Sequence, residues 1–338
     1  MLAKPLFHRH ETLYCAQYRV LKERSLTPEA LLVGTPGTLH QRNGTGYAYC
    51  YRVYYPVPGI QAETLVGRAD DRGTLAHMRQ RMEAAKWMAR QVGALRKAGF
   101  QVADKRMARL LVELHNLGAF SAGLIVLGEL ALQAWLNELG ALLRSRRGAA
   151  SASATLHLGV QPSFLDLPVA PQLPFVPVED SPATGVGLGG LEGLRVSLGL
   201  AGSGTGTGTT GEPEAASACA WSARAAPCYD YLLEAPESAA MLAGGHCVPV
   251  LLPSAARLVW YTLFECSTIA TPDHGAPMRR LALALAAALI EQDPWALLTA
   301  WEKAPVGLTT ALRSLRPGVV AEAAAHDELC DLLDDCLR

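Results

Sequence analysis

Between Gly37 and Gly67, hydrophobic and polar residues alternate in runs that are separated by the turn sequences NGTG (43–46) and PVPG (56–59). Alternation with a period of two predicts β-strands, and the two turns predict a three-stranded antiparallel meander. The middle strand places five residues on one face, namely Tyr47, Tyr49, Tyr51, Val53 and Tyr55. We expect this tyrosine row to pack against a helix in the core. The alternative is that it stacks on nucleic-acid bases, beside His40, Arg42 and Arg52.

After the meander the hydrophobic period becomes that of a helix. Apolar residues within 75–99 recur every three or four positions, and Gly99 is placed to end this helix. Asp104 is placed to cap a second helix, which we expect to stop at Gly118.

The centre of the chain alternates predicted strands and helices. A short buried strand over 123–127 is broken by Gly128, and helical spacing resumes from Glu129. The runs SASATLHLGV (151–160) and LRVSLGL (194–200) each predict a further strand. Later elements are predicted as a helix over 229–242, a strand over 246–253, and helices over 253–268, 277–292, 294–303, 308–315 and 318–337.

This order of elements predicts an α+β protein in three parts. The first (1–118) holds the antiparallel β-meander and helices, the second (119–252) a mixed α/β sheet, and the third (253–338) a helical region. A Gly- and Thr-rich segment at 201–218 predicts a flexible insertion.

A formal G-x-G-x-x-G occurs at Gly185, Gly187 and Gly190. A dinucleotide site requires a strand before this pattern and a helix after it. Here a Pro-rich stretch precedes the pattern and a predicted strand follows it, so we do not expect a dinucleotide site.

The composition and the lack of targeting signals favour a folded cytoplasmic protein over a secreted or membrane protein. Hydrophobic residues make up 50% and charged residues 18%, as is typical of a folded globular protein. No apolar run is long enough to cross a bilayer and no secretory signal opens the chain, so we expect a cytoplasmic protein with no membrane partner. The eight cysteines include no C-x-x-C pair, and we expect free thiols instead of disulfides or a zinc site.

The two parts of the chain differ in charge. Residues 1–150 contain 21 Lys and Arg against 11 Asp and Glu, a net charge of +10, whereas the remainder contains 9 against 20, a net charge of −11. A basic N-terminal half can attract the phosphates of a nucleotide or a nucleic acid.

In its order of elements the chain resembles the nucleotidyltransferase fold of the polymerase-beta superfamily. More narrowly, it is similar to an uncharacterised bacterial family of nucleotidyltransferase-like proteins over most of residues 31–303. The resemblance lies in the segments TPGTLHQRNGTGYAYCYRVYYPVPGIQAETLVG, LLVELHNLGAFSAGLIVLGELALQAW, LEGLRVSLGL, YDYLLEAP, VPVLLPSAARLVWYTLFECS and LALALAAALIEQDPWALLTAWE. It implies a Gly turn that binds nucleotide phosphates and three carboxylates on adjacent strands that hold two Mg²⁺ ions.

The sequence departs from that plan at each acidic position. Thr155 and His157 stand where the family has paired carboxylates, and Ser197 stands at the third position. Gly128 matches the turn glycine, but Glu129 takes the usual place of Ser or Thr and would repel phosphate.

The family's basic residues would fall near positions 260–262, where none is basic, and at Arg279–Arg280. Loss of three carboxylates removes the attraction for two divalent cations. We therefore expect a nucleotidyltransferase fold without catalysis, acting as a binding or regulatory scaffold for a nucleotide, a nucleic acid or a protein partner, with no metal and no cofactor.

Two alternatives remain open. The protein could be an active Mg²⁺-dependent nucleotidyltransferase that moves a nucleotidyl group from an NTP to RNA, protein or a small molecule, with Asp166 or Asp230 as the acids. His157 could also bind a softer metal or act as a base, although a hydrogen-bonded structural histidine is the simpler expectation.

Overall fold

The computed structural model describes residues 4–26, 29–44, 46–143, 155–178, 184–202, 221–268 and 272–338. The chain folds as an α+β protein, as the sequence predicts. The expected flexible insertion at 201–218 lies outside the described residues, apart from its first two positions.

A mixed sheet forms the centre of the described structure. Its eight strands run in the order β12-β13-β5-β7-β10-β9-β8, with β11 paired to β10. The pairs β13–β5, β7–β10 and β10–β11 are parallel, whereas the remaining pairs are antiparallel. The strands are β5 (Ile125–Val126), β7 (Thr155–Val160), β8 (Phe175–Pro177), β9 (Thr184–Val186), β10 (Arg195–Leu200), β11 (Arg224–Ala225), β12 (Glu237–Ala243) and β13 (His246–Leu252).

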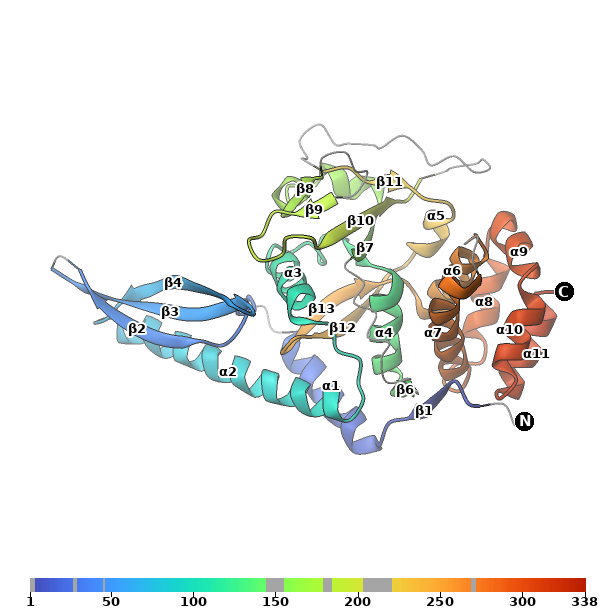
Figure 1. Ribbon diagram of the computed structural model, residues 1–338, viewed down its shortest axis with the longest axis horizontal. Coiled ribbons are helices and arrows are strands. Elements are labelled where there is room, and N and C mark those ends of the chain that lie inside the picture. The colour runs from blue at the N-terminus through green and yellow to red at the C-terminus, as the bar shows by residue number, and fades with distance from the viewer. Residues whose placement is uncertain are drawn as a thin grey trace.

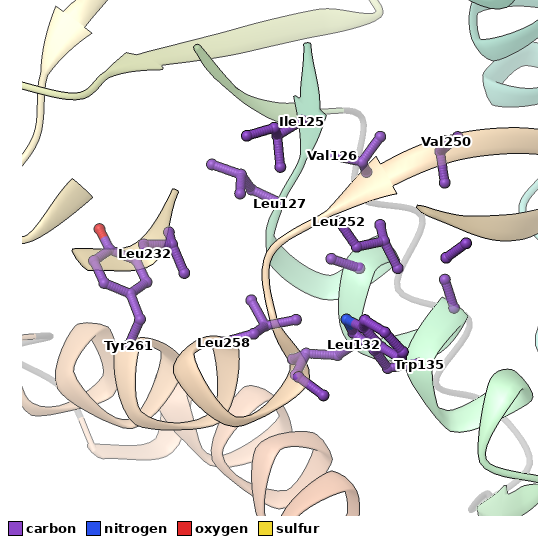
Figure 2. Packing of buried hydrophobic residues seen from close by; sticks show 14 of the residues in the cluster. Ile125, Val126, Leu127, Leu132, Trp135, Leu232, Val250, Leu252, Leu258 and Tyr261 are labelled. Atoms are coloured by element: carbon purple, nitrogen blue, oxygen red, sulfur yellow. The ribbon is translucent and has the colours of Figure 1, made fainter. Parts of the chain in front are cut away.

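Helices cover this sheet through apolar side chains. Figure 2 shows Ile125 and Leu127 from the β5 segment, Leu132 and Trp135 from α4 (Gly128–Glu138), and Leu258 from α6 (Ala255–Thr268) converging in one core. α4 and α6 both pack against α7 (Pro272–Ile290). A second, smaller core lies where α1 (Thr12–Ser25) and α2 (Arg72–Lys97) pack against the β12–β13 hairpin.

The two helices predicted after the meander, α2 and α3 (Lys105–Asn116), end where the sequence indicates. Gly99, with φ of 98°, follows α2, and the Asp104 carboxylate accepts hydrogen bonds at the start of α3. Gly118, with φ of 75°, follows α3. These caps confirm the predicted boundaries because glycine adopts a positive φ without strain.

The predicted meander forms β2 (Thr38–Asn43), β3 (Ala48–Val57) and β4 (Ile60–Arg68). It projects from the body alongside the first part of α2 (Figure 1). The expectation that the tyrosine row faces a helix is wrong. Tyr47 and Tyr55 are exposed, whereas Cys50 and Arg52 on the opposite face are buried. Gly67, the strand partner of Cys50, lies against Thr74 of α2, so it is the Cys50 face that the helix covers.

Arg52 is buried on that inner face because its guanidinium group satisfies backbone carbonyls. It donates to the carbonyl oxygens of Val33 at 2.7 Å, Thr35 at 2.6 Å and Pro36 at 3.1 Å. An arginine can be buried when its donors are paired in this way. Arg52 therefore fixes the segment before β2 to the meander.

The helix predicted over 229–242 is also wrong. α5 (Tyr229–Leu232) is one turn long, and the residues from Glu237 onward form β12. Pro236 disfavours a helical conformation at Ala235, which has φ of 52°, and a hairpin through Gly244 pairs the following residues with β13. The glycine pattern at 185–190 spans β9 and the turn before β10, so a strand follows it, as predicted.

The C-terminal region is helical, as expected, with one correction. Residues predicted as a single helix over 318–337 form two helices that are separated near His326. The helices after α7 are α8 (Ala296–Glu302), α9 (Val306–Arg313), α10 (Arg316–Ala323) and α11 (Asp327–Cys336). Figure 1 shows them grouped on the side of the molecule away from the meander.

The N-terminal segment is held by residues that are distant from it in the sequence. β1 (Phe7–Arg9) pairs with β6 (Ala141–Leu143), and the Leu6 amide donates to the His326 Nε2 atom at 3.0 Å. The Phe7 ring stacks on the His326 ring. None of the described helices is both long and apolar enough to span a bilayer.

Candidate functional site

Thr155, His157 and Ser197 share one face of the central sheet. β7 and β10 run parallel, and their register places Ser197 beside His157 and Arg195 beside Thr155. Residues aligned in this way point to the same side of a sheet. The structure therefore brings together the three positions at which the resemblance would place carboxylates.

Gly128 lies directly against His157. It has φ of 65°, and a Cβ atom added to it would lie 3.4 Å from Cδ2 and 3.5 Å from Cγ of His157. The Leu127 amide donates to the His157 carbonyl at 2.9 Å, which fixes the turn against β7. A positive φ favours glycine, so the break at Gly128 has a local cause.

A cavity of about 830 Å³ opens beside this turn. Four of the five predicted site residues line it: Gly128, Glu129, Thr155 and His157. Ser197 lines a smaller cavity, to which Thr155 also contributes. The larger volume lies within the range of cavities that bind small organic molecules.

Carboxylates reach the larger cavity from separate elements. Asp104 accepts hydrogen bonds from the amides of Arg106 and Met107 at 2.7 and 2.9 Å, and the Glu129 carboxylate accepts one from Gln133 Nε2 at 2.9 Å. Glu265 of α6 is the remaining acid among the described lining residues. Within the described ranges, no three His, Cys, Asp or Glu side chains group closely enough to hold a metal ion.

His157 is exposed at the cavity wall but is surrounded by protein on its other sides. Burial lowers the pKa of its imidazole below the ordinary value. The neutral form therefore predominates at pH 7, and this form offers one hydrogen-bond donor and one acceptor.

Glu265 is a further acid of the site, and the sequence pattern alone had not indicated it. Solvent reaches its side chain through the cavity, yet the surrounding protein limits its hydration, and this burial raises the pKa to about 7. A hydrogen bond with the Tyr261 hydroxyl opposes the effect in part. At neutral pH the carboxyl group is thus divided between its protonated and ionised forms.

Thr262, one residue after Tyr261, presents a hydroxyl group in the same wall. Its side chain is 1% exposed, and its Oγ1 atom has no hydrogen-bond partner among the described residues. Buried hydroxyl groups normally have a partner, so this unpaired atom, whose accessible area is below 1 Å², is an exception behind the cavity wall. The helical spacing of Leu258, Tyr261, Thr262 and Glu265 was the signal in the sequence, because it places polar groups on a face otherwise expected to be buried.

The smaller cavity, of about 260 Å³, lies over the edge of β10. Its polar lining residues are Thr155, Thr184, Arg195, Ser197, Ser222 and Arg224. It is therefore more basic than the larger cavity, in which Arg96 and Lys105 are accompanied by the three acids.

The acids considered as alternatives lie elsewhere. Asp166 belongs to the 3-10 helix η1 (Pro162–Asp166) and Asp230 to α5, and neither lines either cavity. Arg279 forms an ion pair with Glu322 of α10, and neither it nor Arg280 lines a cavity.

In comparisons with known proteins, no family model matches the chain, and no curated protein or solved structure is significantly similar to it.

Proposed function

We propose that the protein is a nucleotidyltransferase-like binding protein that holds a nucleotide in the larger cavity without catalysing nucleotidyl transfer. The observation that supports this most is the grouping of Thr155, His157 and Ser197 on one sheet face beside Gly128. At these positions catalysis by two metal ions would require carboxylates. Hydroxyl groups and a neutral imidazole offer no comparable attraction to Mg²⁺.

The lining of the larger cavity suits an organic ligand with hydrogen-bonding groups. Tyr229 and Tyr261 lie edge to face with their ring centroids 5.4 Å apart, and Leu258 adds apolar surface. His157 and Glu265 supply an imidazole and a partly protonated carboxyl group. Small-molecule sites commonly combine an apolar wall with a few such polar groups.

The test has two arms on the full chain. Purified protein is incubated with each radioactive NTP, Mg²⁺ and candidate acceptors, and we expect no incorporation of label. In the second arm, calorimetry with nucleotides in EDTA should detect binding that weakens in Thr155→Val, while Thr309→Val on α9, away from both cavities, serves as the matched control. Mg²⁺-dependent incorporation that disappears in Asp166→Ala or Asp230→Ala would contradict the proposal.

A second candidate function is nucleic-acid contact through the outer face of the meander. The exposure of Tyr47 and Tyr55 favours it, because exposed rings can stack on bases. Arg42 and Arg68 lie on the same face, but they pair with Glu63 and Asp70, so stacking contributes more than charge. Binding to a single-stranded oligonucleotide that is lost in Tyr47→Ala/Tyr55→Ala supports this function; equal binding by that variant excludes it.

A further inference from the structure

The smaller cavity lies at an interruption in the edge of the central sheet. β9 pairs with Arg195 and Val196 at the start of β10, and β11 pairs with Gly199 and Leu200 at its end. Between them, Ser197 and Leu198 have no strand partner on that side among the described strands. The cavity occupies this position, with both residues in its lining.

The parallel registers direct the polar side chains of this region to the same side. Arg195 aligns with Thr155 on β7, and Arg224 aligns with Gly199 two residues beyond Ser197. Arg195, Ser197 and Arg224 therefore point to the face that carries Thr155. Serine and threonine hydroxyls and two guanidinium groups meet in one cavity.

The smaller cavity is positively charged, whereas a site that binds cations is negatively charged. Two arginines line this cavity, and no acidic residue occurs among its described lining residues. Guanidinium groups bind phosphate through paired, charge-assisted hydrogen bonds, and hydroxyl groups can donate further ones. Arg195 is engaged in another interaction as well, so Arg224 is the better residue to substitute.

The dimensions suit a phosphate group attached to a larger molecule. The cavity of about 260 Å³ is several times the roughly 30 Å³ that one water molecule occupies in the liquid. Thr155 lines both cavities, so the smaller one adjoins the larger one at this residue. A ligand can therefore place an anionic group beside Arg224 and its organic body beside His157.

We propose that the smaller cavity binds the phosphate group of a phosphate monoester directly, without a metal ion, through Arg224, Arg195 and the hydroxyls of Ser197 and Thr155. This inference rests on the proposed function, because it assigns the phosphate of the nucleotide to a site. Arginine and hydroxyl groups then provide the attraction for phosphate that bound Mg²⁺ would provide in an active enzyme.

Calorimetry of the full chain in EDTA tests the assignment with three probes: inorganic phosphate, adenosine 5′-monophosphate and adenosine. We expect phosphate and the monophosphate to bind, and adenosine to bind at least about tenfold more weakly than the monophosphate. Arg224→Gln should weaken binding of the monophosphate by about 10- to 100-fold, which is the effect of losing one charge-assisted hydrogen bond. Arg313→Gln, on an exposed part of α9, makes the same change of charge away from the cavity and should leave binding unchanged.

Ser197→Asp is the second variant, and it places a carboxylate among the arginines and should weaken binding of the monophosphate as well. The inference is overturned if adenosine and its monophosphate bind equally, if inorganic phosphate does not bind, or if folded Arg224→Gln and Ser197→Asp bind like the unsubstituted protein. Equal binding of adenosine and its monophosphate would still leave the larger cavity as a nucleoside site. Mg²⁺-dependent nucleotidyl transfer would instead contradict the proposed function, so the two failures are distinguishable.

Discussion

Substitution of Gly128 by alanine measures how far the turn beside His157 depends on glycine. With φ of 65°, an alanine at this position adopts the left-handed conformation, which costs an L-residue about 1–2 kcal/mol. The added methyl group would lie 3.4–3.5 Å from His157 atoms, which is ordinary van der Waals contact, so no steric clash adds to this cost. We therefore expect the free energy of unfolding to fall by about 1–2 kcal/mol.

The chain supplies a matched control at Gly93. This residue lies inside α2 with no neighbouring atom within 4 Å of an added Cβ, so alanine there should raise the free energy of unfolding by about 0.5–1 kcal/mol. Urea unfolding monitored by circular dichroism gives both changes, provided that the m value, the slope of the free energy of unfolding against urea concentration, is unchanged.

The changes in the free energy of unfolding must have opposite signs for Gly128→Ala and Gly93→Ala. The same sign and size for both variants would refute the role of the backbone conformation. If His157→Ala removed the cost of Gly128→Ala, crowding at the imidazole would be the cause instead.

Three further substitutions test other parts of the structure. The raised pKa means that folded Glu265 keeps a proton that the unfolded chain releases, so the free energy of unfolding should fall as pH rises from about 4.5 to about 7. Glu265→Gln should remove this dependence. Denaturation curves that shift equally in both proteins between pH 5 and pH 8 would disprove it. Trp260 is fully buried and donates to the Leu297 carbonyl at 2.9 Å, so Trp260→Ala should cost about 3–5 kcal/mol in urea unfolding, and a loss below 1 kcal/mol would be inconsistent with this packing. Arg52→Gln leaves some of the three carbonyl groups unpaired and should lower the free energy of unfolding by about 2–3 kcal/mol. The meander should also become more sensitive to proteolysis, and unchanged sensitivity would argue against the anchoring role of Arg52.

Elements with a strong local cause could be predicted from the sequence. The turns of the meander, the Asp104 cap and the break at Gly128 depend on backbone conformation and on hydrogen bonds between near neighbours. β12 could not be predicted in this way. Its sequence ESAAMLA contains good helix formers, and its extended form depends on pairing with β13.

The orientation of the meander shows a second limit. Alternation divides β3 into two faces but does not determine which face a helix covers. The aromatic face is the more apolar in sequence, yet Arg52 lies on the covered face because carbonyls from residues 33–36 satisfy it. These carbonyls come from a preceding segment whose path the alternation does not reveal.

Some residues of the candidate site could be predicted from the sequence, whereas others depend on tertiary packing. The resemblance led to Gly128, Thr155, His157 and Ser197, and the structure places them on one face or beside one turn. Glu265 and Thr262 could not be predicted as site residues, because their position beside the cavity depends on how α6 packs against the sheet. The raised pKa of Glu265 likewise arises from that docking and not from its neighbours in sequence.

The contact between Leu6 and His326 constrains the order in which the molecule can be completed. The ribosome makes β1 long before it makes α10 and α11, so β1 cannot acquire this partner until His326 has been synthesised. Bringing together two segments so distant in sequence also has a large loop-closure entropy. The joining of β1 to the C-terminal helices therefore comes after its pairing with β6 becomes possible, and until it occurs the Phe7 ring lacks the His326 ring on which it stacks.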